Sequence, residues 1–139
     1  RLRDDIASLL RKLQHRIDAR VADEARSAAD IAKTLLALRQ MQHVALKPVR
    51  FADPAWDMML DLLVAEAEGK QVSVSSLCIA SGVPSTTALR RIHAMTDLGT
   101  FERVPDLHDN RRIFIKLSSA ASQSLRHLLV RWYEIEAPP

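Results

Sequence analysis

The sequence has 139 residues, a length that suits one domain with an appended helical arm and leaves no room for a second, catalytic domain. Hydrophobic residues make up 47% of the chain but aromatic residues only 4%, a balance typical of a mostly helical protein. Lys and Arg outnumber Asp and Glu by 20 to 17. Such a small excess favours a polyanionic partner only where the positive charge is clustered.

A single cysteine, Cys78, excludes an internal disulfide framework and a multi-cysteine zinc site. This cysteine content is compatible with a reducing compartment, so we expect a cytoplasmic protein. No apolar run approaches the roughly 18 residues that a membrane-spanning helix needs, and no membrane partner is expected. The chain begins with Arg1 rather than Met, and we expect further residues upstream of it.

Residues 1–50 are predicted to be an N-terminal helical arm, because neither Gly nor Pro interrupts the segment from Leu2 to Val44. Its apolar residues recur at steps of three and four and form two stretches: Leu2, Ile6, Leu9, Leu13, Ile17, Val21, then Ile31, Leu35, Leu38, Met41, Val44. The stripe weakens over residues 22–30, so one long helix and two helices with a break there both remain open. The stripe packs either on its own domain or on a second copy of the chain. Dimerisation is favoured, because so long a helix rarely buries its whole stripe within so small a fold.

The second segment, residues 51–117, begins within the end of a linker over residues 47–52. Asp53 is suited to cap the start of a helix, Pro54 suits its first turn, and Gly69 stands where that helix would end. The apolar stripe of this helix is predicted to lie in the core rather than at a cofactor site, and it comprises Trp56, Met59, Leu60, Leu63 and Ala67.

The residues that follow predict a helix-turn-helix. Either Ser73 or Ser75 can cap a brief helix that ends at Gly82, and residues 83–85 make a tight connection. A longer helix then runs through Leu98. Its inward positions are predicted to be Ala88, Leu89, Ile92 and Met95. A short helix, a tight turn and a longer helix are the parts of a helix-turn-helix.

Three segments are strand-like: residues 71–74, 100–104 and 112–117. The last two are joined by a polar turn and are predicted to form a hairpin. Ser118 can cap a final helix, and residues 118–139 are a second candidate for dimerisation.

These elements together predict a mainly α (α+β) fold. It is a winged helix-turn-helix DNA-binding domain over residues 51–117, with a small β-hairpin wing and flanking N- and C-terminal dimerisation helices. In such a domain one helix enters the major groove of DNA, while the tip of the hairpin reaches the neighbouring backbone or minor groove.

Small hydroxyl and guanidinium groups gather on the outward side of the longer helix, at Ser85, Thr86, Thr87, Arg90 and Arg91. Small hydroxyls allow close approach to DNA, and guanidiniums bind phosphate or guanine. The alternative is that these groups form only a solvated polar face, as on any surface helix. The hairpin tip favours DNA binding, because Arg111 and Arg112 stand beside Asp106 and Asp109, and a bare turn needs no paired arginines.

The wing region resembles the MarR family of winged helix-turn-helix transcriptional regulators. That family has a G-L-hydrophobic-E-R strand, a D-x-R-D-x-R wing and a hydrophobic-x-L-[ST] strand end. The corresponding segments here are residues 99–103 (GTFER), 106–111 (DLHDNR) and 115–118 (IKLS). The resemblance covers about residues 54–132, and the wing motif is its most specific part. Two positions depart from the pattern: His108 replaces the first wing arginine, and Thr100 replaces the usual leucine.

The resemblance implies roles for several residues. It makes Arg111 the arginine that enters the minor groove and Asp109 its brace, with residues 87–91 facing the major groove. Arg103 and Arg112 would contact phosphates. It also implies a homodimer joined through the terminal helices, and a small-molecule inducer that releases DNA.

Other chemistry lacks support in the sequence. The five histidines are scattered and have no ligand at metal-binding spacing. The three glycines are isolated, so no phosphate loop exists, and no nucleophile elbow is visible. A redox-sensing role for Cys78 is disfavoured because its helical position is predicted to be buried. We expect no enzyme, no metal and no cofactor.

The sequence therefore favours a dimeric, sequence-specific double-stranded DNA-binding regulator that acts as a repressor. The rival is a winged-helix protein–protein interaction module with a coiled-coil arm, because winged helices also bind proteins.

Overall fold

A computed structural model describes the backbone of residues 1–45 and 53–136. Its elements follow in this order: α1 (Leu2–Ala45), α2 (Pro54–Ala67), β1 (Val72–Ser73), α3 (Val74–Ala80), α4 (Ser85–Asp97), β2 (Phe101–Pro105), β3 (Ile113–Leu117), α5 (Ser119–Glu136). The predicted linker over residues 47–52 lies outside the described residues.

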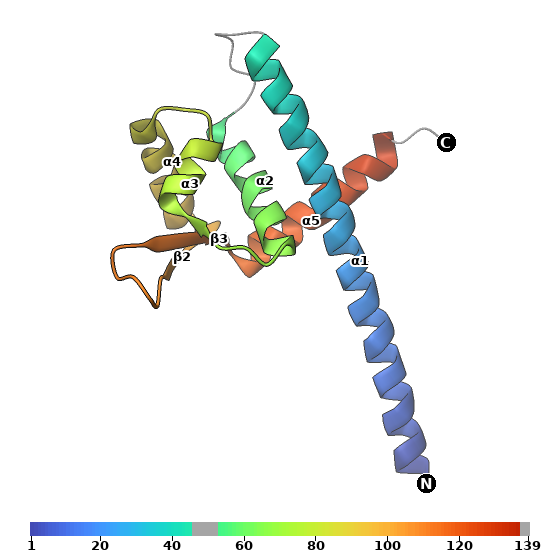
Figure 1. The fold of residues 1–139 in the computed structure, drawn as a ribbon. Helices are drawn as coiled ribbons and strands as arrows, with labels where there is room; N and C mark the ends of the chain where they lie inside the picture. Colours follow the sequence, from blue (N-terminus) through green and yellow to red (C-terminus); the bar gives the residue numbers. More distant parts are fainter. Residues whose placement is uncertain (46–52, 137–139) are drawn as a thin grey trace.

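Helices dominate the structure, and the described strands form one small antiparallel sheet in the order β1-β3-β2. Helices α2, α3 and α4 and this sheet make a body, against which α1 and α5 pack (Figure 1). Helices α3 and α4 form a helix-turn-helix, and the β2–β3 hairpin follows it as a wing. This is the predicted winged helix-turn-helix, so the expected fold class is confirmed.

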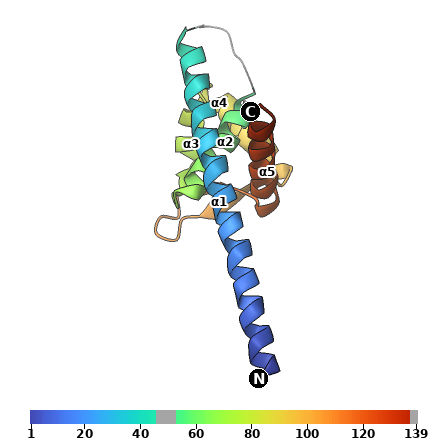
Figure 2. The same ribbon diagram turned by 90° about the vertical axis from the view of Figure 1, so that its right-hand side faces the viewer.

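The N-terminal segment is one continuous helix rather than two, which resolves the open alternative. Only the second half of α1 lies against the body, where Ala28, Ala29 and Ala32 are buried against α2 and α5. The first half projects beyond the body, as the two perpendicular views show (Figures 1 and 2).

The core lies between α2, the helix-turn-helix and the inner face of the sheet. Its largest fully buried side chains are Phe101, Met58, Leu60, Leu63, Leu77, Ile92, Ile115 and Leu129. The predicted stripe of α2 is confirmed at Leu60 and Leu63, whereas Trp56 and Met59 lie half-buried at the edge of the core. The prediction was wrong for Ala67, which is exposed at the end of the helix. Asp53 caps α2 as predicted, because its Oδ1 accepts a hydrogen bond from the Ala55 amide at 2.8 Å.

The helix-turn-helix forms through short-range capping. Ser73, not Ser75, caps α3, and its hydroxyl accepts a hydrogen bond from the Ser76 amide at 3.1 Å. The turn after α3 needs a residue in the left-handed region, which Gly82 supplies with a φ of 69°. One inward prediction for α4 was wrong: Leu89 is 40% exposed, because α4 packs through Ala88, Ile92 and Met95 instead.

The wing is held to the body by the alternation of β3. Ile115 and Leu117 point into the core while Lys116 between them is exposed, as a strand with one buried face requires. The register pairs Phe101 with Leu117 and Pro105 with Ile113, so the two strands stay matched along their length.

Polar contacts fasten the flanking helices. The Ser122 hydroxyl of α5 donates to Oε2 of Glu66 on α2 at 2.5 Å. Nζ of Lys33 lies 2.8 Å from Oε1 of Glu68. In the second half of α1, Arg39 forms an ion pair with Asp57 of α2, with side chains only 13% and 9% exposed.

The buried Arg39–Asp57 pair is predicted to matter far more than an exposed one on the same helix. Arg39→Ala leaves the Asp57 carboxylate buried without its cation, and the free energy of unfolding should fall by about 3 kcal/mol. The control is Arg26→Ala, which removes the exposed Arg26–Asp23 pair and should cost less than about 1 kcal/mol. Urea denaturation followed by circular dichroism measures both, and equal losses would contradict the prediction.

Candidate nucleic-acid interface

Helices α3 and α4 and the β2–β3 loop lie on the side of the body that faces away from α1 (Figure 1). The predicted DNA-contacting side chains come from two of these elements, α4 and the wing. This side of the body is therefore the candidate interface.

The first turn of α4 presents three small hydroxyl residues to solvent, since Ser85, Thr86 and Thr87 are all exposed. Pro84 stands at the N-cap, and no side-chain hydrogen bond caps this helix in the described residues. The first-turn amides thus point outward at the positive end of the helix dipole, an arrangement that suits a phosphate oxygen.

The two neighbouring arginines of α4 differ in their surroundings. Arg90 is exposed. Arg91 is bound to Asp53: its Nε donates to Oδ1 at 2.9 Å, and its Nη2 pairs with Oδ2. The hydrogen bonds from Arg91, and then from the Ala55 amide, lower the pKa of Asp53. Arg91 therefore connects α4 to the start of α2. Its side chain is still 39% exposed, so it remains accessible to a phosphate, and its DNA contact stays a prediction.

A second polar contact joins α4 to the wing. Nη2 of Arg103 on β2 lies 2.6 Å from Nδ1 of His93 on α4, and a neutral His93 accepts this hydrogen bond. The contact holds the guanidinium of Arg103 next to α4. Sequence reasoning missed both His93 and the Asp53–Arg91 pair, because no local pattern links residues so far apart in the chain.

The wing tip is a hydrogen-bonded turn with an extended arginine. Oδ1 of Asp106 accepts from the His108 amide at 2.8 Å, and Oδ1 of Asp109 accepts from the Arg111 amide at 3.0 Å. Nε of Arg111 lies 3.5 Å from Oδ1 of Asp109, yet the Arg111 side chain is 94% exposed. The carboxylates thus shape the turn, and the wing presents the guanidinium of Arg111 to solvent.

Arg112 is placed differently from Arg111. Its guanidinium carbon lies 5.9 Å from the centroid of the Phe114 ring, within the range of a cation–π contact. Arg112 directly precedes β3 and lies two residues before Phe114, and residues two apart in extended backbone share a face, so their spacing alone was a usable signal. Phe114 was not among the predicted site residues.

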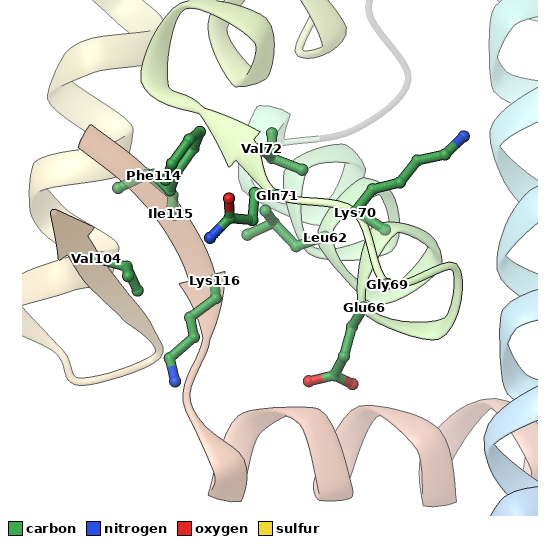
Figure 3. A pocket seen from close by; sticks show the side chains of 11 residues that line it. Leu62, Glu66, Gly69, Lys70, Gln71, Val72, Val104, Phe114, Ile115 and Lys116 are labelled. Carbon is green, nitrogen blue, oxygen red and sulfur yellow. The ribbon is translucent and has the colours of Figure 1, made fainter. Parts of the chain in front are cut away.

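A cavity of about 350 Å³ lies between the end of α2, β1 and the hairpin strands. Its wall is largely apolar and includes Leu62, Val72, Val104 and Phe114 (Figure 3). The charged groups at its rim are compensated, since Lys116 pairs with Glu102 at 3.5 Å and Lys70 with Glu68 at 3.0 Å. The wall therefore favours an apolar occupant over a charged one.

The described residues contain no cluster of three or more His, Cys, Asp or Glu side chains suited to a metal ion. No helix in the part of the chain that the structure covers is long and apolar enough to cross a bilayer. Cys78 is buried, and desolvation raises the pKa of its thiol, which makes the reactive thiolate scarcer.

Neither the protein-family models nor the curated proteins contain a match to this chain. Among solved structures, it is similar to MarR-type regulators at low identity. For a mutant of Lactococcus lactis ZitR, the identity is 9% and the TM-score 0.46, and the match covers 66% of this chain and 59% of ZitR, about three fifths of that protein. For the heme sensor protein PefR with heme and carbon monoxide, the identity is 15% and the TM-score 0.49, and the match covers 92% of this chain and 79% of PefR. For a mutant of Escherichia coli MarR complexed with operator DNA, the identity is 14% and the TM-score 0.47, and the match covers 89% of this chain and 73% of MarR.

The Asp53–Arg91 pair predicts a specific dependence of stability on pH. Asn caps helices about as well as Asp, so Asp53→Asn removes mainly the charge. Arg91 lowers the pKa of Asp53 in the folded state. The pair therefore stabilises the protein at pH values above 3.8, the ordinary pKa of Asp, and this stabilisation disappears as the pH falls through the pKa of Asp53 in the folded protein. Urea titrations should show wild type more stable than the variant at pH 7, with the gap closing below pH 3.8. A gap independent of pH would refute this assignment.

Proposed function

We propose that this protein is a sequence-specific double-stranded DNA-binding transcription regulator that works as a homodimer and represses by occluding a promoter. The observation that carries the proposal is the wing tip, where Asp109 holds the turn and Arg111 extends 94% exposed into solvent. A guanidinium held in this way matches the arginine that winged proteins insert into a narrow minor groove.

The division of labour follows from the placement of the side chains. The exposed start of α4 enters the major groove, where Ser85, Thr86, Thr87 and Arg90 contact base edges. The remaining arginines of the site bind phosphates and so position the protein on the duplex; they are Arg91, Arg103 and Arg112. Arg91 and Arg103 are already oriented by Asp53 and His93, so less conformational entropy is lost when they bind phosphate.

We propose no catalytic role, and the expected compartment is the cytoplasm. A small-molecule inducer stays a prediction of the family resemblance, and the apolar cavity of Figure 3 supports it through its volume and lining. The rival function is a protein-interaction module, in which the same arginines would have no effect on partner binding.

The first test is the affinity for a mixed-sequence duplex, measured by fluorescence anisotropy at several salt concentrations. Arg111→Ala should weaken binding about ten-fold or more, and the slope of log affinity against log salt should shrink by about one. The matched control is Arg26→Ala, which removes an exposed arginine from α1. An unchanged affinity for Arg111→Ala, or equal losses in both variants, would favour the protein-interaction module.

A second test separates base reading from phosphate binding. Thr87→Ala should change which duplex sequences are preferred while leaving the salt slope close to that of wild type, because a hydroxyl contributes no charge. Binding to a panel of duplexes that differ at single positions measures the preference. If Thr87→Ala weakens all duplexes equally, Thr87 does not read bases.

A further inference from the structure

The tip of the wing carries an exposed leucine together with its exposed arginine. Leu107 is 92% exposed, the highest value among the large hydrophobic residues whose burial the structure describes. The side chain of Arg111, on the other arm of the same loop, is 94% exposed. The β2–β3 loop that carries both residues extends away from the body (Figure 1). The tip therefore presents one apolar and one cationic side chain to the same partner.

Hydrogen bonds of the loop place these two residues opposite one another. The Asp106 amide donates to the Arg112 carbonyl at 3.2 Å and so closes the loop. Leu107 and Arg111 are the first residues beyond this contact, one on each arm. The hydrogen bond from the His108 amide to Oδ1 of Asp106 spans Leu107 and restricts its backbone. Leu107 and Arg111 are therefore neighbours across the loop.

The core of the protein does not use Leu107. The wing is anchored by Ile115 and Leu117 of β3, which are buried, whereas Leu107 lies at the far end of the hairpin. The other residues of the loop, 106 and 108–112, are all polar or charged, as turn residues usually are. Burial of an aliphatic side chain is favourable in proportion to the apolar area removed from water. A partner that covers Leu107 therefore gains affinity, and the adjacent Arg111 selects a polyanion as that partner.

The minor groove of DNA accommodates both kinds of side chain. Its negative potential is strongest where the groove is narrow, and arginine binds there. Proteins that bind this groove also insert leucine, isoleucine or phenylalanine between adjacent base pairs, which partly unstacks the pairs and kinks the duplex. When the guanidinium of Arg111 occupies the groove, Leu107 faces the same groove from across the loop. The tip thus combines a charged contact with an apolar wedge.

We propose that Leu107 inserts between two adjacent base pairs from the minor groove, beside the guanidinium of Arg111, and kinks the duplex toward the major groove. The inference rests on the DNA binding of the proposed function. It adds to that function a bend in the DNA and the residue that produces the bend.

The wedge gives the wing a sequence preference that needs no hydrogen bond to a base. Unstacking costs least at pyrimidine–purine steps, which are TA and CA/TG. The complex therefore favours such a step under the wing, next to the narrow stretch of groove that holds Arg111. The start of α4 reads the major groove at other positions, so the two preferences fall on separate parts of the site.

Two fluorescence measurements on one duplex test the wedge. The duplex is the sequence that wild type selects most strongly from a randomised pool. One version carries 2-aminopurine in place of single adenines along the site, because this base fluoresces more strongly when it is unstacked. A second version carries donor and acceptor dyes at its two ends, so that a bend raises the energy transfer. All spectra are taken at saturating protein, where a loss of affinity does not imitate a loss of bending.

Saturating wild type should raise the 2-aminopurine signal about two-fold or more at one step on each flank and should raise the energy transfer. Leu107→Ala should still bind, because Arg111 and α4 remain, but both signals should stay near those of the free duplex. Leu107→Phe keeps an apolar wedge and should restore both signals. The matched control is Leu98→Ala, which removes a leucine that is 75% exposed at the C-terminal end of α4 and should behave as wild type.

The outcomes separate this inference from the proposed function. If wild type binds the duplex without unstacking or bending it, or if Leu107→Ala unstacks and bends it as wild type does, the wedge is overturned and DNA binding stands. If wild type binds no duplex at low salt, the proposed function fails and the wedge fails with it.

Discussion

Small residues on one side of α1 determine how the molecule is put together. Ala28, Ala29 and Ala32 are all buried against α2 and α5, because alanine lets helices approach closely where longer side chains would hold them apart. Polar contacts on either side of this patch, from Glu24 to His127 and from Arg39 to Asp57, fix the rotation of α1 against the body. Because α1 is one continuous helix, these contacts of its second half also set the direction in which its first half projects from the body.

The candidate interface, formed by α4 and the wing, depends on this body for its order. Ile92 and Met95 anchor α4 in the core, while Ile115 and Leu117 anchor the wing. Contacts between elements then orient the arginines around them, with Asp53 holding Arg91 and His93 holding Arg103. Exposed cations whose orientation is set before binding lose less entropy when they meet a phosphate. Arg111 is the exception, because only its own turn holds it.

Much of this arrangement was predictable from the sequence, because its determinants are local. The caps at Asp53 and Ser73, the glycine turn at Gly82 and the alternation of β3 each lie within a few residues of the structure they specify. Distant contacts were not predictable, since nothing near Arg91 indicates Asp53 as its partner. The weak stripe between residues 22 and 30 left open whether the helix breaks there, because the sequence does not show that alanines at these positions serve close packing. Leu89 shows the opposite error, an apolar residue left 40% exposed because its neighbours fill the core.

The central functional claim is that α4 and the wing read double-stranded DNA. The most direct measurement is selection of bound duplexes from a randomised pool by the wild-type chain, followed by sequencing. A homodimer with two copies of the recognition surface predicts enrichment of a two-fold symmetric sequence, flanked by A·T-rich steps whose narrow minor groove accepts Arg111. A pool that shows no enrichment over its starting composition, at salt concentrations low enough for phosphate contacts to form, would contradict this claim.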